Sequence, residues 1–348
     1  MKILAMDLGK SKTVFCDYDS KDGKYKFGKL KTSPQQIHDL LLKQCPDKAV
    51  FEICSAAGWI YDIANALNIE VEVANPNHQG WRWKKVKRKT DRDDALKLAQ
   101  LSAMKQLPTV HIPRKDVRQK RSLIAYRRKL VERRTQIKDS IRALLDREGL
   151  STPSGKNGWS QSALQRLKSM AVPISEAGND CLWRGQLWME LSQLEHIEYS
   201  LSEVTSALDS AGKTDTAVQL LQSIPGVGPR LSEAIVVYLD EPGRFDSCKK
   251  VGSYAGLTPK QYQSGSMDRQ GKISGQGNPL LRSLLVEVSW LGIRYNSWMR
   301  RIYDRLLRGS PSRKKIAITA VARKLLVRCW AMLRDGQPWH TETSSKAA

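Results

Sequence analysis

The segment Ile3-Leu4-Ala5-Met6-Asp7 is an apolar run that ends in a carboxylate, and Ala49-Val50-Phe51-Glu52 repeats the pattern. Apolar runs of this length are typical of buried strands, so we expect two strands that each end in an acid. A third segment, Ala95-Leu96-Lys97-Leu98-Ala99, is helix-like and follows Asp91 and Asp94. Residues three apart share one face of a helix, so these two acids are expected on the same face.

The segments around these runs indicate an α/β domain over residues 1–112. Gly9 and Asp22-Gly23 provide turns between short strand-like runs. We expect strands at 2–8, 12–18, 24–30, 48–54 and 69–74, and helices at 34–44, at 58–68 and from Thr90 onward. The order β-β-β-α-β-α-β-α fits a mixed sheet flanked by helices.

The four carboxylates Asp7, Glu52, Asp91 and Asp94 predict a metal site. Strand ends beside an acid-bearing helix gather oxygen ligands, which hard cations such as Mg²⁺ prefer. Two such ions about 3.5–4 Å apart can clamp the attacking and leaving oxygens of a phosphodiester. The alternative for Asp91 and Asp94 is a helix start that simply tolerates acids in its first turn. Thr90 is the expected N-cap of that helix, and Asp93 is expected in solvent.

The charge balance of the chain points to a polyanionic partner. Its 348 residues contain 58 Lys and Arg against 35 Asp and Glu, which gives a formal net charge of +23. Phosphate neutralisation supplies much of the affinity for nucleic acids, so DNA or RNA is the expected partner. Basic residues alternate with Trp81 and Trp83 in a pattern suited to gripping a nucleic-acid strand, although a solvated face is the ordinary explanation. The expected contacts in this run are Lys84, Lys85, Lys87, Arg88 and Lys89.

Cysteine and hydrophobic patterns exclude several classes of protein. The six cysteines are scattered without a CxxC pair, which favours free thiols in a reducing compartment over a disulfide or zinc framework. No run reaches about 18 apolar residues, and the N-terminus lacks a signal-peptide pattern. We therefore expect a cytoplasmic protein without a membrane partner.

Residues 113–212 predict a helical coiled-coil hairpin. Leucine and isoleucine repeat every seven residues along two segments that a Ser/Gly/Asn stretch at 151–159 separates. The repeated positions are Leu123, Leu130, Ile137 and Leu144 in the first segment, and Leu187, Leu194, Leu201 and Leu208 in the second. The hairpin would serve dimerisation or nucleic-acid contact. The alternative is an ordinary helical linker packed on a core.

Residues 213–340 form a third expected domain, followed by a disordered tail at 341–348. Its first motif is the turn Ile224-Pro225-Gly226-Val227-Gly228, which opens a helix. Glycines at such a turn let backbone amides approach a phosphate, and the segment resembles a helix-hairpin-helix. We expect nucleic-acid contacts at Gly226, Gly228 and Arg230. The alternative is a tight turn between two helices.

Ser264, next to Gly265, lies in a Gly/Ser-rich segment at 264–278 that composition predicts to be a loop. A serine in a loop is usually polar filler. An exposed serine can also attack phosphorus, with Lys272, Arg269 or Arg282 stabilising the charge that develops. The residues alone leave both interpretations open.

Taken together, these motifs resemble one family. The acidic quartet, the IPGVG turn, Tyr254-Ala255-Gly256-Leu257-Thr258-Pro259, Ser264-Gly265, Gly271-Lys272-Ile273 and Asn278 are shared features. Over residues 1–335 the chain resembles the DEDD transposases of bacterial insertion sequences, which are relatives of the Piv-type DNA invertases and are bridge-RNA-guided recombinases.

The resemblance implies an RNase H-like, RuvC-like first domain in which Asp7, Glu52, Asp91 and Asp94 bind one or two Mg²⁺ ions. It implies that Ser264 attacks a DNA phosphodiester and forms a covalent phosphoserine intermediate during strand exchange. The implied partners are double-stranded donor and target DNA, a structured guide RNA, and further copies of the chain in a dimer or tetramer. The implied location is the bacterial cytoplasm, at the nucleoid. Gln263 departs from relatives that carry an acid before the serine.

Two other functions remain open at this point. One is a RuvC-like Holliday-junction or structure-specific endonuclease, in which the acids act without a covalent intermediate. The other is a non-catalytic nucleic-acid-binding protein, against which the intact quartet counts.

Overall fold

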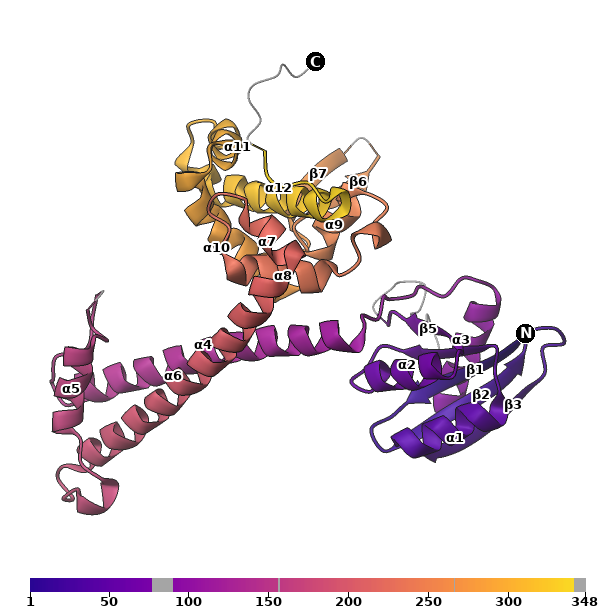
Figure 1. Ribbon diagram of the computed structural model, residues 1–348, viewed down its shortest axis with the longest axis horizontal. Coiled ribbons are helices and arrows are strands. Elements are labelled where there is room, and N and C mark those ends of the chain that lie inside the picture. The colour runs from indigo at the N-terminus through magenta and orange to yellow at the C-terminus, as the bar shows by residue number, and fades with distance from the viewer. Residues whose placement is uncertain (77–89, 156, 266, 341–348) are drawn as a thin grey trace. The chain divides into compact units, whose positions relative to one another are not determined.

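The apolar runs of the N-terminal segment form a five-stranded mixed sheet with the order β3-β2-β1-β4-β5 (Figure 1). In this computed structural model, which describes residues 1–76, 90–155, 157–265 and 267–340, the chain divides into two compact units, Met1–Asp116 and Val117–Ala348. The first boundary predicted from the sequence lies at residue 112. The further division of the second unit at residue 212 stays a prediction.

Strand directions in the first unit follow the RNase H-like arrangement. β1 pairs antiparallel with β2, β2 pairs antiparallel with β3, and β4 and β5 run parallel to β1. The strands are β1 (Lys2–Leu8), β2 (Lys12–Asp19), β3 (Tyr25–Lys31), β4 (Lys48–Glu52) and β5 (Glu70–Ala74), and the helices are α1 (Pro34–Gln44), α2 (Ala57–Ala66) and α3 (Asp91–Ala103). The predicted RNase H-like α/β domain is therefore confirmed, although β4 ends at Glu52 rather than at residue 54.

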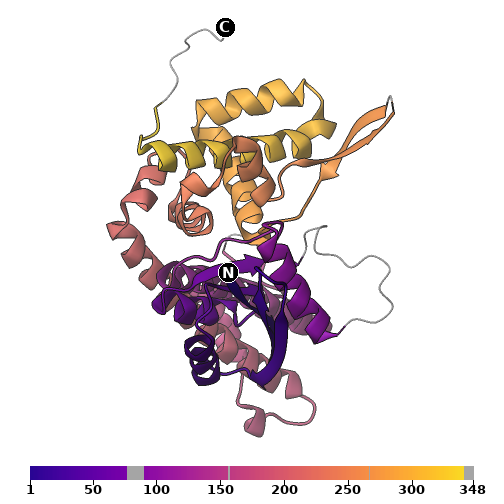
Figure 2. The same cartoon turned by 90° about the vertical axis from the view of Figure 1, so that its right-hand side faces the viewer.

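Alternation along the strands sends side chains to two separate cores. Leu4, Met6 and Phe51 pack on one face with residues of α1 and α2. Ala5 and Val50 point to the other face, where α3 packs. Figures 1 and 2 show α1 and α2 on the side of the sheet opposite to α3. This division matters because the acids of β1 and β4 lie on the α3 face.

The second unit begins with two long helices, α4 (Lys115–Arg147) and α6 (Leu182–Thr214). Arg127 Nε donates to Thr205 Oγ1 at 2.9 Å, and Lys138 Nζ lies 3.1 Å from Glu198 Oε1. The residue number of the partner in α6 therefore decreases as the residue number in α4 increases, which shows that the two helices pack antiparallel. Figure 1 shows α5 (Gln161–Met170) at their far end.

Most of the predicted heptad positions face the interior of this helix pair. Leu130 and Leu144 of α4 are buried, as are Leu187, Leu194, Leu201 and Leu208 of α6, whereas Leu123 and Ile137 are half-buried. Ile141, Leu145 and Leu191 form a further core with Leu167 of α5 at the end of the hairpin. A supercoil, and dimerisation through the hairpin, stay predictions.

The remainder of the second unit is mainly helical and is organised around α12 (Lys314–Asp335). Seven residues of α12 between Ala317 and Cys329 are buried, so this helix lies inside the core. Around it lie α7 (Thr216–Gln222), α8 (Pro229–Leu239), α9 (Cys248–Tyr254), α10 (Pro279–Tyr295), α11 (Ser297–Leu307) and the 3-10 turns Pro242–Arg244 and Pro311–Arg313, whereas the 3-10 turn Ile174–Glu176 packs against the start of α6. Burial raises the pKa of the Cys329 thiol to about 12, so it stays protonated. Among the described helices, none is long and apolar enough to span a membrane.

The segment expected to be a loop at 264–278 instead forms part of a β-hairpin. β6 (Pro259–Ser264) pairs antiparallel with β7 (Met267–Ile273). Almost every residue of both strands is exposed, so no alternation of buried and exposed positions marks them in the sequence. Figure 2 shows the hairpin extending away from the helices of this unit.

Candidate active site and nucleic-acid contacts

Asp7 and Glu52 lie side by side at the carboxyl ends of two parallel strands. Met6 of β1 pairs with Phe51 of β4, so the next residue on each strand is the acid. Two residues earlier, Ala5 and Val50 are partners and are buried beneath α3. Because side chains alternate along a strand, both carboxylates point to the α3 face. Both are half-buried.

The direction of α3 brings its first turn to the same edge of the sheet. Near the end of α3, Ser102 Oγ donates to Glu72 Oε2 at 2.6 Å. Glu72 also accepts from Lys48 Nζ at 2.7 Å, and Lys48 is the first residue of β4. The end of α3 therefore lies toward the start of β4. At 1.5 Å per residue, the first turn lies about 16 Å away, toward the carboxyl ends of the strands.

Asp91 and Asp94 continue the buried stripe of α3 toward that edge. Ala95 and Leu98 are buried, and each acid precedes one of them by four residues, so it lies one turn nearer the helix start. Asp94 is half-buried and Asp91 is exposed. The fold thus directs all four predicted acids to one edge of the α3 face.

Asp93 caps the start of α3. Its Oδ2 accepts from the Thr90 backbone N–H at 3.0 Å and from Thr90 Oγ1 at 2.6 Å, while Thr90 Oγ1 accepts from the Asp93 N–H. This capping box confirms Thr90 as the N-cap of α3 and accounts for the acid at position 93.

The donor set of the quartet suits a hard divalent cation. Across the described residues, no three of these four carboxylates have oxygen atoms that all lie within 4.8 Å of one another. Carboxylates repel one another in the absence of a cation, whereas an oxygen-only set of four acids matches the preference of Mg²⁺. The acids fit the predicted metal, and their role as its ligands stays a prediction.

Ser264 is the last residue of β6 and pairs with Met267 across the hairpin turn. Gly265 in that turn has φ +55°, a conformation that favours glycine. Ser264 and Lys272 are both exposed, so the hydroxyl group and the ammonium group are accessible to a partner.

Arg282 makes a hydrogen bond within the second unit. Its Nη1 donates to the Ala255 carbonyl at 3.0 Å, and a Cβ on Gly256 would lie 2.8 Å from the same nitrogen. Arg282 therefore supports the turn after α9. No local pattern predicts this contact, because the partners are 27 residues apart.

The IPGVG segment connects α7 to α8 as a tight turn, with Ile224 and Val227 buried. Gly226 has φ +88°, and a Cβ there would lie 3.1 Å from the Cα atom of Gly292 in α10. Gly228 is the N-cap of α8, and a Cβ there would meet nothing within 4 Å. The structure thus supports the tight-turn explanation for Gly226 and leaves Gly228 open to solvent.

Arg230 of α8 pairs with Asp209 of α6 and with Glu233, whose Oε1 lies 3.2 Å from Arg230 Nη2. Glu233 is only 4% exposed, and burial raises the pKa of its carboxyl above the ordinary value. Arg230 therefore balances a buried acid. The five expected contacts at residues 84–89 lie outside the described residues.

Replacing Gly226 with serine is expected to lower the free energy of unfolding by about 1–3 kcal/mol, because serine disfavours φ +88° and crowds Gly292. Gly228→Ser is the matched control. Serine is a good N-cap residue and has open space there, so stability should stay equal or rise slightly. Thermal unfolding of both variants measures the change in stability. Equal losses of stability in the two variants would contradict the role of the close contact between Gly226 and α10.

Comparisons with known proteins agree with this architecture. A DEDD transposase family model, described as "Transposase", matches residues 4–149, and the "Transposase IS116/IS110/IS902 family" model matches residues 218–304. The transposase for insertion sequence element IS1111A of Coxiella burnetii is 25% identical, over 96% of this chain and 90% of its own length. The pilin gene-inverting protein of Moraxella lacunata is 28% identical, over 73% of this chain and 69% of its own.

Among solved structures, Thermus thermophilus RuvC in complex with a Holliday junction substrate covers 32% of this chain and 99% of its own, at 14% identity and a TM-score of 0.24. A score this low supports no inference, so the fold assignment rests on the strand order. The two family models cover the acid-bearing unit and the turn-to-helix segment that the motifs predicted. The chain belongs to the DEDD transposase family of bacterial insertion sequences, a family of DNA-recombining enzymes.

Proposed function

We propose that this transposase cleaves and exchanges DNA strands at a Mg²⁺ site formed by Asp7, Glu52, Asp91 and Asp94, with Ser264 as the nucleophile. The observation that carries the proposal is the register of β1 and β4, which sets Asp7 beside Glu52 at the edge toward which α3 directs its first turn. When bound there, Mg²⁺ would stabilise negative charge on the phosphoryl oxygens.

In the proposed reaction, Ser264 Oγ forms a bond to phosphorus as the bond from phosphorus to one sugar oxygen breaks. The serine proton is lost to solvent or to a base, and the departing sugar oxygen takes up a proton. Attack by the freed sugar hydroxyl of another strand reverses these steps, restores the serine and joins the new strands. Energy is conserved in the phosphoserine bond, so no external cofactor is consumed.

The quartet belongs to the first unit and Ser264 to the second. The proposal therefore requires the two units to act on the same phosphodiester, within one chain or between protomers of a dimer or tetramer. The exposure of Ser264 at the end of β6 supports this requirement.

A structured guide RNA that selects donor and target DNA is the second part of the proposal. The net charge of +23 supports it, because the protein would bind RNA and heteroduplex by charge and backbone shape while base pairing supplies sequence choice. The proposed setting is the bacterial cytoplasm, at the nucleoid.

The competing function is a RuvC-like Holliday-junction or structure-specific endonuclease. The quartet by itself favours it, since four acids in one unit could activate water without Ser264. The two functions differ in one product, which is the covalent protein–DNA adduct.

The test is to incubate the protein with element-end DNA, RNA from the flanking region of the element, and Mg²⁺. We expect a denaturation-resistant adduct that mass spectrometry assigns to Ser264, and no adduct when EDTA replaces Mg²⁺. Cleavage without an adduct would establish the endonuclease instead. Recombination that is independent of the RNA would refute the proposed role of the RNA as a guide.

A further inference from the structure

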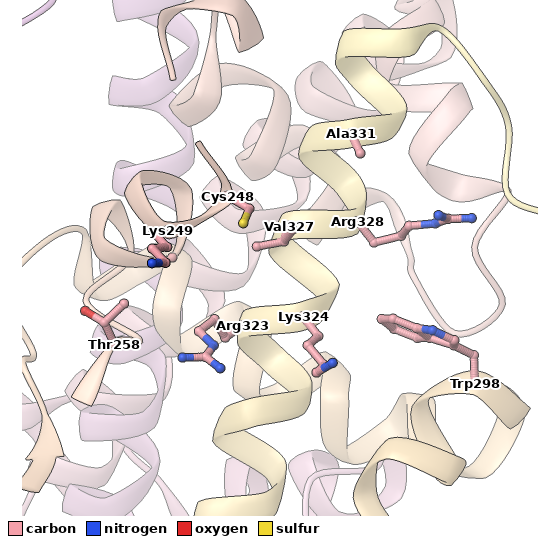
Figure 3. A pocket seen from close by; sticks show the side chains of 10 residues that line it. Cys248, Lys249, Thr258, Trp298, Arg323, Lys324, Val327, Arg328 and Ala331 are labelled. Atoms are coloured by element: carbon pink, nitrogen blue, oxygen red, sulfur yellow. The ribbon is translucent and has the colours of Figure 1, made fainter. Parts of the chain in front are cut away.

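A pocket of about 530 Å³ opens on the second unit between α9 and α12, with Trp298 of α11 at one side (Figure 3). Four cationic side chains line it, and no carboxylate does. They are Lys249 of α9 and Arg323, Lys324 and Arg328 of α12. No sequence pattern marks this cluster, because the cations come from segments about 75 positions apart.

The walls of the pocket hold these side chains in place. Gly252 of α9 leaves room for Arg323, since a Cβ there would lie 3.3 Å from the Cγ and Cδ atoms of the arginine. Trp298 packs edge-on against Trp339 with ring centroids 5.4 Å apart, and Arg328 lies 5.4 Å from the centroid of Trp339. Figure 3 shows the Trp298 indole opposite Lys324 and Arg328.

Among the described residues, the four cations have no carboxylate partner. Within residues 1–76, 90–155, 157–265 and 267–340, no ion pair joins Lys249, Arg323, Lys324 or Arg328 to a carboxylate. Lys250, the neighbour of Lys249, shows the contrast because it pairs with Asp246. A cluster of unpaired positive charges around a cavity concentrates anions there.

We propose that this pocket binds an unpaired nucleotide of a nucleic-acid strand, with phosphates on the cations and the base against Trp298. The half-buried indole offers an aromatic surface, and stacking on it requires a base that has left its own helix. The cavity volume falls within the range of about 300–1,000 Å³ that suits small-molecule ligands, which favours one nucleotide over a duplex. This proposal rests on the proposed function in one respect, which is that the ligand is a nucleic acid.

The position of the pocket connects it to the hairpin that carries Ser264. Thr258 lines the pocket and directly precedes β6, whose other end is Ser264. Thr258 and Ser264 are six residue steps apart, which an extended strand spans in about 20 Å, the length of about six nucleotides at the 3.4 Å rise of duplex DNA. The pocket would thus hold a strand several nucleotides from the phosphodiester that the serine attacks.

The test compares two double variants of the full chain. Lys249→Ala with Lys324→Ala removes two exposed lysines from the pocket. Lys314→Ala with Lys315→Ala removes two exposed lysines from the start of α12, which do not line it. Both double variants lose two lysines and the same net charge. A difference in binding between them therefore reports the position of the lysines rather than the total charge of the protein.

Binding is measured by fluorescence anisotropy over a range of salt concentrations, with single-stranded DNA, RNA of the same sequence, and duplex DNA as probes. The pocket variant should bind a single strand with a log-log salt slope smaller by about 1.4 than wild type, since each lost phosphate contact removes about 0.7. The control should keep the wild-type slope. Equal salt slopes in the two variants would overturn the proposal that the pocket binds a nucleotide. A reduced slope with only DNA or only RNA would identify the kind of strand that the pocket binds.

Trp298→Leu separates stacking from charge. We expect single-strand affinity about 5- to 150-fold weaker than wild type with an unchanged salt slope, because base stacking on an aromatic ring contributes on this scale. Unchanged affinity would refute the base contact. A wild-type protein whose binding does not depend on salt would instead refute the nucleic-acid function as a whole.

Thiol alkylation gives a readout that needs no substitution. Cys248 lines the pocket and is an exposed free thiol, and Cys45 of the first unit is an exposed free thiol elsewhere. A bound single strand should slow alkylation of Cys248 by maleimide and leave Cys45 unchanged. Equal rates at Cys248 with and without the strand would contradict occupation of the pocket.

Discussion

Asp7→Asn is expected to lower Mg²⁺-dependent DNA strand cleavage by about 10³-fold or more. Asparagine keeps the shape of the side chain and removes the negative charge, so the fold should persist while the metal loses a ligand. The loss of metal-based charge stabilisation is worth several kcal/mol in the transition state, and each 1.36 kcal/mol changes a rate tenfold. Cleavage assays at saturating DNA measure the effect, and calorimetric titration with Mg²⁺ or Mn²⁺ reports the lost ligand independently of activity.

Two adjacent residues of α3 give this prediction a close control. Asp94→Asn should behave like Asp7→Asn, because Asp94 lies on the buried stripe that leads to the edge of the sheet. Asp93→Asn makes the same change one position earlier. An asparagine oxygen can still accept from the Thr90 N–H, so the helix cap and the activity should both survive. Equal activity of the Asp93 and Asp94 variants would remove Asp94 from the metal site.

Ser264→Ala is expected to abolish the covalent protein–DNA adduct and to reduce strand exchange by about 10⁴-fold or more, the scale on which loss of a nucleophile acts. Because Ser264 is exposed at the end of β6, removal of its hydroxyl should leave stability and nucleic-acid affinity unchanged. Denaturing gels of trapped complexes measure the adduct, and anisotropy measures binding.

Ser274→Ala is the matched control for the nucleophile. Ser274 follows β7 at the base of the same hairpin, and its backbone N–H donates to the Thr258 carbonyl at 2.8 Å, a bond that alanine keeps. The control should form the adduct at the wild-type rate. If Ser264→Ala still recombined DNA normally, the nucleophile would be a different group. If it cleaved DNA normally without exchange, hydrolysis by the first unit would be the better description.

The amino-acid sequence by itself determined the elements of the first unit. Apolar runs, turn residues and the N-cap at Thr90 predicted all five strands and the start of α3 to within about two residues, because these signals are local. The acid at the end of each strand was visible for the same reason. Heptad spacing likewise predicted the helices that became α4 and α6. The metal ligands and the role of Ser264 remain predictions, since spacing indicates chemistry without testing it.

Only the tertiary structure decided how several of these residues are used. Gly226 meets Gly292, Arg230 balances the buried Glu233, and Arg282 donates to Ala255. The β6–β7 hairpin formed where composition predicted a loop, because both of its faces are exposed and leave no periodic pattern. The pocket of Lys249, Lys324 and Trp298 assembles from three helices. Periodicity and propensity encode a residue's own helix or strand, whereas its distant neighbours depend on how those elements pack.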